Sequence, residues 1–159
     1  MEIRVSIGSQ RMLLVDTDGA CIRRYAISTA ALGAGEQIGS FQTPRGRHLI
    51  RARIGAGLPL CAVFKARRPT GEVWTPDLQT AQPERDWILS RILWLSGTEV
   101  GCNRLGCVDS MRRYIYIHGT PDTEPMGVAA SHGCIRMRNR DVVELFELVQ
   151  AGTPVLIEA

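Results

Sequence analysis

The amino-acid sequence predicts a single, mostly β domain over residues 1–159, with one prominent helix near the C-terminus. Three features indicate this fold class. Short segments alternate apolar and polar residues, as at Ile3, Val5 and Ile7, which is the pattern of a half-buried strand. Turn-forming residues separate these segments at short intervals, and only one late segment has a strong helical pattern. No linker interrupts the chain, and 159 residues are enough for one domain with a core.

The N-terminal part of the chain reads as strands joined by tight turns. Residues 3–7 and 11–15 predict a hairpin, and residues 20–28 predict a third strand after an Asp/Gly turn. Glycines then mark residues 29–39 as a loop. A further turn is expected at residues 43–46, where proline presets one dihedral and glycine tolerates positive φ.

The middle of the chain has a weaker pattern. Its long apolar segment, residues 86–96, fits either a helix or a buried strand, and its β-branched and aromatic residues favour a strand. A strand at residues 110–117 is then expected to deliver His118 to its end. The other elements expected here are strands at residues 48–53 and 60–64 and loops at residues 67–71, 75–83 and 97–109.

The predicted helix is amphipathic and lies late in the chain. Apolar residues recur at i, i+3, i+4 and i+7 from Val142 to Val149. Asn139 is expected to be its N-cap, because a short polar side chain can accept from the exposed N–H groups of the first turn. Gly152 is expected to end the helix, and residues 155–157 are expected to form the last strand.

Composition and charge exclude several classes of protein. Apolar residues make up 45% and charged residues 22% of the chain, as in ordinary soluble domains. The net charge of +3 is too small to indicate a nucleic-acid partner. Five dispersed cysteines do not form a disulfide framework. No apolar run is long enough to span a membrane and no secretory signal is visible, so we expect a cytoplasmic location, or a periplasmic one if the sequence is trimmed.

The candidate chemistry is concentrated in residues 114–137. His118 and Cys134 are separated by 134 − 118 = 16 positions, and a loop of this length can bring the imidazole and the thiol together. A thiol with an ordinary pKa of about 8.5 is mostly protonated at neutral pH, and only the thiolate attacks well. His118 is therefore predicted to take the proton of Cys134 and to return it later to a leaving amine.

Neighbouring residues suggest how a substrate would be held. Because Gly133 has no side chain, the N–H groups of Gly133 and Cys134 can point at a developing oxyanion. The guanidinium of Arg136 can hold a substrate carboxylate. Two alternatives stay open at this point: His132 as the base, and a zinc site built from His118, His132 and Cys134.

Two short motifs carry a family resemblance. Ile-His-Gly-Thr at residues 117–120 and Ser-His-Gly-Cys-Ile-Arg-Met at residues 131–137 resemble the catalytic motif of the L,D-transpeptidase (YkuD) family. The strand that opens with Gln10, the Thr43-Pro44-x-Gly46 turn and the late helix also follow the order of that family. The resemblance therefore spans nearly the whole chain.

The resemblance implies a β-sandwich-like fold and a cysteine enzyme without a cofactor or metal. Its nucleophile would be Cys134, which attacks the bond between the L-centre of diaminopimelate and D-Ala in a peptidoglycan stem peptide. The base would be His118 rather than His132, with the backbone carbonyl of Gly119 orienting the imidazole. The substrate-binding residues it implies are Arg136, Ser131 and His132, and Ser131, His132 and Gly133 also shape the loop.

The resemblance leaves open which acceptor resolves the acyl-enzyme. Signal-less members of the family resemble L,D-carboxypeptidases that trim D-Ala from tetrapeptides during peptidoglycan recycling, so hydrolysis is the first expectation. Cross-linking L,D-transpeptidation is the alternative, and a non-enzymatic muropeptide sensor that binds through Arg136 is the second alternative. The expected partner is in each case a peptidoglycan tetrapeptide or muropeptide. Residues 55–82 are expected to form a lid or substrate wall.

Overall fold

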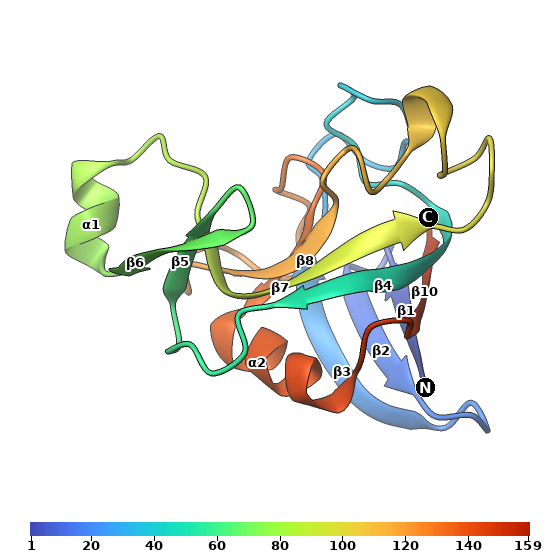
Figure 1. Cartoon of the computed structure of the whole chain (residues 1–159), viewed down its shortest axis with the longest axis horizontal. Helices are drawn as coiled ribbons and strands as arrows, with labels where there is room; N and C mark the ends of the chain where they lie inside the picture. Colours follow the sequence, from blue (N-terminus) through green and yellow to red (C-terminus); the bar gives the residue numbers. More distant parts are fainter.

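The computed structural model describes all of residues 1–159 and contains ten strands, two α-helices and one 3-10 turn (Figure 1). The elements are β1 (Glu2–Ser6), β2 (Arg11–Val15), β3 (Cys21–Ser28), β4 (Gly46–Ile54), β5 (Ala62–Lys65), β6 (Arg68–Val73), α1 (Pro76–Ala81), β7 (Ile88–Gly97), η1 (Gly106–Val108), β8 (Tyr116–Thr120), β9 (Ile135–Arg138), α2 (Asn139–Leu148) and β10 (Pro154–Glu158). The mostly β class and the single long helix near the C-terminus are confirmed, and so is the strand at β7.

All ten strands belong to one sheet in the order β4-β10-β1-β2-β3-β9-β8-β7-β5-β6. Strand β4 pairs with β10 on one side and with β7 on the other, so the sheet closes on itself. The expected sandwich is therefore a continuous, barrel-like sheet, in which β5 and β6 extend from the beginning of β7. Most pairs are antiparallel, but β8–β9 and β1–β10 are parallel.

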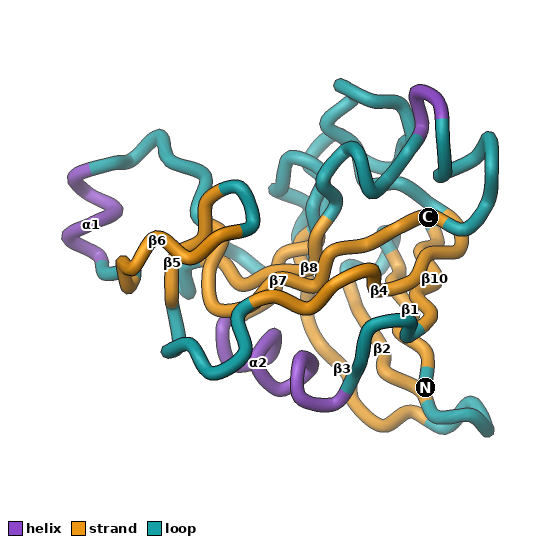
Figure 2. Tube along the Cα trace, in the orientation of Figure 1, coloured by secondary structure: helices purple, strands orange, loops and turns teal.

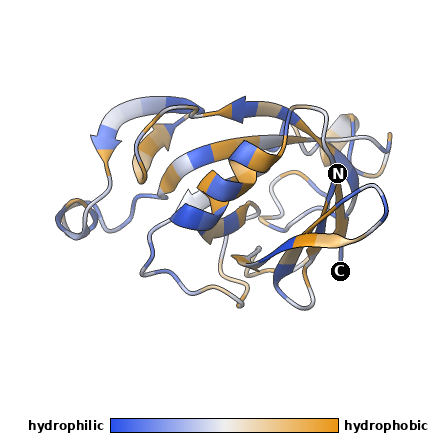
Figure 3. Ribbon diagram, turned by 90° about the horizontal axis from the view of Figure 1, so that it is seen from below, coloured by the Kyte–Doolittle hydropathy of each residue, from blue (hydrophilic) through white to orange (hydrophobic).

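The main core lies between the inner face of this sheet and α2, which packs against β7, β8 and β9. Val142, Leu145 and Phe146 of α2 are buried in it, whereas Arg140 and Glu144 are exposed. The alternation of apolar and polar bands along α2 is visible in Figure 3. Burying each large apolar side chain contributes about 1.5–3 kcal/mol, so α2 is held by its packing rather than by its caps.

A small lobe beside the barrel is made of β5, β6 and α1 (Figure 2). Strand β5 lies where a strand was expected at residues 60–64, whereas β6 and α1 lie where loops were expected. The loop predicted at residues 67–71 is instead part of β6, since a tight turn at Ala66 and Arg67, both with positive φ, folds β6 back onto β5. The loop predicted at residues 75–83 contains α1. Its start signal was present in the sequence: Thr75 caps the helix by accepting from the Leu78 N–H at 3.1 Å, and proline follows at the first helical position.

The bounds predicted for the strand at residues 110–117 are also wrong. Strand β8 begins at Tyr116, and the residues before it form turns. The carboxylate of Asp109 accepts from the N–H groups of Leu105 (2.7 Å) and Arg112 (2.9 Å), and these bonds favour turns over an extended chain. His118 therefore lies in the middle of β8 and not at its end.

The N-cap assignment of Asn139 is wrong as well. Asn139 is the first residue of α2, the cap position is Arg138, and no side chain caps the helix. The amide of Asn139 is fully buried and used elsewhere: it donates to Thr120 O at 2.8 Å and accepts from Ser90 Oγ at 2.6 Å. The helix ends at Leu148, before the expected Gly152. Neither α1 nor α2 has the length and apolar character required to cross a bilayer.

Candidate active site

Strands β8 and β9 place the predicted site residues on one face of the sheet. Their parallel register sets Ile117 opposite Ile135 and His118 opposite Arg136. Ile117 and Ile135 point into the core, so His118 and Arg136 project from the outer face. Cys134, one residue before β9, shares this outer face two positions from Arg136. The imidazole and the thiol are thus brought to the same side of neighbouring strands.

The imidazole of His118 is held in one orientation. Its side chain is buried, and Nδ1 lies 2.6 Å from the carbonyl oxygen of Gly119. Because a carbonyl can only accept, Nδ1 carries the proton and Nε2 keeps its lone pair. Burial lowers the pKa of His118, and its hydrogen bond to Gly119 only partly offsets this effect. His118 is therefore a neutral imidazole with a free acceptor nitrogen at neutral pH.

The thiol of Cys134 lies between backbone groups of the preceding segment. Its Sγ is 3.4 Å from Tyr116 N and 3.4 Å from Tyr114 O. Tyr114 has a φ of +56°, an uncommon conformation for a tyrosine. Burial raises the pKa of the Cys134 thiol to about 12. The resting pair is thus a neutral thiol and a neutral imidazole; they share a face, and the thiol is hydrogen-bonded to Tyr114 rather than to His118.

The loop that carries Cys134 is fixed by buried hydroxyl groups. Ser131 Oγ donates to Cys134 O at 2.6 Å and accepts from Gly133 N at 3.2 Å, so this hydroxyl shapes the loop. Ser131 is buried, which disfavours the substrate contact expected for it. Thr43 Oγ1 donates to Gly133 O at 2.9 Å and accepts from Ala30 N at 3.0 Å. The loop is thereby tied to two other segments.

The two glycines of the site are required for different reasons. Gly133 has a φ of +132°, a conformation that disfavours any side chain. Its N–H is taken by Ser131, whereas the N–H of Cys134 donates to no protein acceptor. At Gly119 the requirement is space: a Cβ there would lie 2.5 Å from Asn139 Oδ1 and 2.6 Å from Leu89 O.

Two hollows, each of about 320 Å³, meet at this loop. The first is mainly apolar and contains Cys134 together with the exposed side chains of Phe41 and Tyr114. The second is polar and contains Arg136 and Thr120. His132 is exposed and borders both hollows. Substrate groups can therefore approach the loop from two sides.

Comparison with known proteins identifies the family. A family model described as the L,D-transpeptidase catalytic domain (YkuD) matches residues 1–157. The chain belongs to this family of enzymes. A Bacillus licheniformis protein that carries the name YkuD is 50% identical over 46 residues, which are 29% of this chain and 28% of its own length. A Salmonella typhimurium protein named ErfK/SrfK is 34% identical over 93 residues, 57% of this chain and 29% of its own length. The matched parts are thus less than a third of these relatives.

Solved L,D-transpeptidases share the fold. A structure from Mycobacterium smegmatis superimposes with a TM-score of 0.59 at 19% identity and covers 99% of this chain and 58% of that one. L,D-transpeptidase 3 from Mycobacterium tuberculosis gives a TM-score of 0.60 at 14% identity, with 99% and 60% covered. The barrel-like sheet with its late helix is therefore the L,D-transpeptidase fold.

Two charged residues near the thiol of this L,D-transpeptidase domain carried no signal in the sequence. Arg113 lines the apolar hollow and donates to Gly35 O (3.3 Å), Ser40 Oγ (3.3 Å) and Gln42 O (2.6 Å). It therefore fixes the loop that forms one wall. Asp86 lines the polar hollow, and its Oδ1 lies 3.5 Å from Arg136 Nη2. Both reach the site from segments that the motifs do not include.

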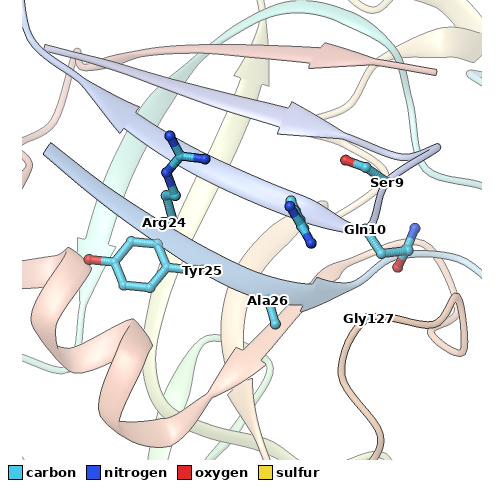
Figure 4. Close-up of a pocket in the computed structure, with 7 residues that line it drawn as sticks. Ser9, Gln10, Arg24, Tyr25, Ala26 and Gly127 are labelled. Atoms are coloured by element: carbon cyan, nitrogen blue, oxygen red, sulfur yellow. The ribbon is translucent and has the colours of Figure 1, made fainter. Parts of the chain in front are cut away.

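Other parts of the L,D-transpeptidase domain do not contribute to this site. A hollow of about 360 Å³ lies along β2 and β3 and is lined by Arg24, Ala26 and Gly127 (Figure 4). It contains none of the predicted site residues. No three histidine, cysteine or acidic side chains lie close enough together to hold a metal ion, so His118 and Cys134 have no third ligand for zinc.

Proposed function

We propose that this protein is an L,D-carboxypeptidase that removes the terminal D-Ala after diaminopimelate from peptidoglycan tetrapeptides. The observation that carries the proposal is the tautomer of His118. Because the Gly119 carbonyl holds the proton on Nδ1, the lone pair of Nε2 is available on the face that also carries Cys134. A thiol nucleophile and an oriented base are the requirements for acyl transfer through a thioester.

In the proposed acylation step, Cys134 attacks the carbonyl carbon of the scissile bond while its proton passes to His118 Nε2. Attack and proton transfer are coupled in this scheme, because burial disfavours both the free thiolate and the imidazolium. The carbonyl oxygen becomes an oxyanion that the N–H of Cys134 can meet. His118 then gives the proton to the departing amine of D-Ala, which leaves a thioester on Cys134.

The terminal carboxylate of the substrate is placed at Arg136 in this scheme. The guanidinium lies in the polar hollow on the same face as the thiol, so a carboxylate bound there would set the adjacent peptide bond near Cys134. Water activated by His118 would then hydrolyse the thioester. Tetrapeptides recycled in the cytoplasm are the substrate pool under this proposal, and the location stays a prediction that cell fractionation tests.

Transpeptidation is the second candidate, and a specific observation favours it. The apolar hollow contains Cys134 but not Arg136, and it would give an amine acceptor an approach separate from the polar hollow. The acylation chemistry is the same, and only the group that attacks the thioester differs.

The deciding experiment incubates the protein with tetrapeptide, with and without a diaminopimelate-containing acceptor, and identifies products by mass spectrometry. Tripeptide and D-Ala as the main products support hydrolysis, whereas a dominant cross-linked dimer would establish transpeptidation. Activity retained by Cys134→Ala would refute both. Saturable binding of the peptide without any turnover would instead point to the muropeptide sensor.

A further inference from the structure

Arg136 has an unusual charge environment. Its side chain is only 11% exposed, and its guanidinium has one backbone acceptor, Ala130 O at 3.3 Å. The single acidic partner is Asp86, whose Oδ1 is 3.5 Å from Nη2. A largely enclosed guanidinium requires a countercharge, and Asp86 supplies it in the free protein.

The backbone at Asp86 is well anchored, but its carboxylate is not. The next residue, Trp87, is buried, and the guanidinium of Arg85 stacks 4.5 Å from the Trp87 ring. Arg85 also pairs with Glu72 at 2.8 Å. By contrast, the side chain of Asp86 is 55% exposed and its only hydrogen bond is the long one to Arg136. The carboxylate can therefore leave Arg136 without any change in the chain around it.

The geometry points to Asp86 as an internal competitor for the carboxylate site at Arg136, so that a carboxylate-ended substrate binds and its product leaves by exchange of one carboxylate for another. This inference rests on the proposed function, because Arg136 is the residue that meets the substrate carboxylate there. While Asp86 is paired with Arg136, an incoming carboxylate forms its ion pair with Arg136 only by breaking the pair between Asp86 and Arg136. The same exchange returns Asp86 to Arg136 when D-Ala is released and limits inhibition by this product.

The electrostatics of the site agree with this position of Asp86. Burial has the largest effect on the pKa of His118 and of Cys134, followed by a backbone hydrogen bond at each group. In addition, the charge of Asp86 raises both pKa values and the charge of Arg136 lowers both. Both charges therefore act on both reacting groups. When Asp86 and Arg136 are paired, their effects on the reacting groups offset each other, and a substrate carboxylate that replaces Asp86 restores the same balance.

A first test needs no turnover. Cys134 is alkylated with iodoacetate, which carries a carboxylate, and with uncharged iodoacetamide, and the modified peptide is quantified by mass spectrometry. Asp86→Asn is expected to raise the iodoacetate-to-iodoacetamide rate ratio about 2- to 5-fold, the size of a partly exposed ion pair. The increase should disappear when Arg136→Gln is added, because the two residues then no longer act as a pair.

Glu84 provides the matched control, since it has the same charge, borders the same hollow and forms no ion pair. An unchanged rate ratio in Asp86→Asn would refute the exchange. An equal increase in Glu84→Gln would also refute it, because the loss of one negative charge near the hollow would then explain the effect without an ion pair to Arg136. Asp86→Ala should behave like Asp86→Asn, and thermal unfolding of each variant verifies that it is folded.

A second test uses the tetrapeptide. Asp86→Asn is expected to lower KM for the carboxylate-ended peptide and the inhibition constant of D-Ala by the same 2- to 5-fold, and to leave KM for the C-terminal amide unchanged. Equal changes for the acid and the amide would contradict the exchange. If Asp86→Asn changes the alkylation ratio but the protein turns over no tetrapeptide, the proposed function is refuted and the competition at Arg136 is not. If the tetrapeptide is turned over but the alkylation ratio does not change, the competition is refuted and the proposed function is not.

Discussion

Replacement of Thr43 by valine tests how the nucleophile loop is held. Thr43 is fully buried, and its hydroxyl donates to Gly133 O at 2.9 Å and accepts from Ala30 N at 3.0 Å. Valine has nearly the same shape, so the change removes two hydrogen bonds without a large cavity. Each backbone group left buried without a partner costs about 1–3 kcal/mol, and the expected loss is about 2–6 kcal/mol. This is a large part of the roughly 5–15 kcal/mol that stabilises a typical domain.

Equilibrium urea unfolding of the wild type, Thr43→Val and Thr43→Ser measures this loss. Serine keeps the hydroxyl, so most of the stability should return. A chain of this size loses about 2 °C of thermal midpoint for each kcal/mol of stability lost, so a loss of about 2 kcal/mol should lower the midpoint of Thr43→Val by at least roughly 4 °C. A loss below about 0.5 kcal/mol, or equal losses for valine and serine, would show that water satisfies these groups and would refute the reasoning.

Three further predictions concern buried groups, most of them in the site. Gly119→Ala should destabilise the fold by about 1–3 kcal/mol in urea unfolding, because its Cβ would lie 2.5 Å from Asn139 Oδ1; a neutral effect would contradict the close packing. Burial lowers the pKa of His48 and His118, so stability should fall as pH drops below about 6.5, where the unfolded chain binds protons first. His118→Gln should reduce the slope, and an unchanged slope would be the contrary outcome. Because the pKa of Cys134 is raised to about 12, this thiol alone should lower the stability by at most about 1.4 kcal/mol per pH unit between pH about 9 and 12. Cys134→Ala should reduce that fall, and a wild-type-like curve would contradict it.

The sequence predicted the components of the site better than their state. His118 and Cys134 were identified because they stand in contiguous motifs, whereas the parallel pairing of β8 with β9 places them on one face. Their protonation was not predictable. Burial is a property of the whole fold, and it raises the pKa of Cys134 and lowers that of His118, so both groups are neutral at rest. Asp86 was missed for a similar reason, since it lies 50 positions from Arg136 in the sequence and only the fold brings the two side chains together.

Strands and the late helix follow from local patterns, so the sequence by itself determined the mostly β class, the strand at β7 and the family motif. Errors occurred where a tertiary contact outweighed a local preference. Asn139 has the chemistry of an N-cap, but its amide instead joins Ser90 to Thr120. Closure of the sheet through β4 and the exchangeable partner of Arg136 were decided only by the tertiary structure. Both depend on pairing between distant segments, and local periodicity carries no information about such pairing.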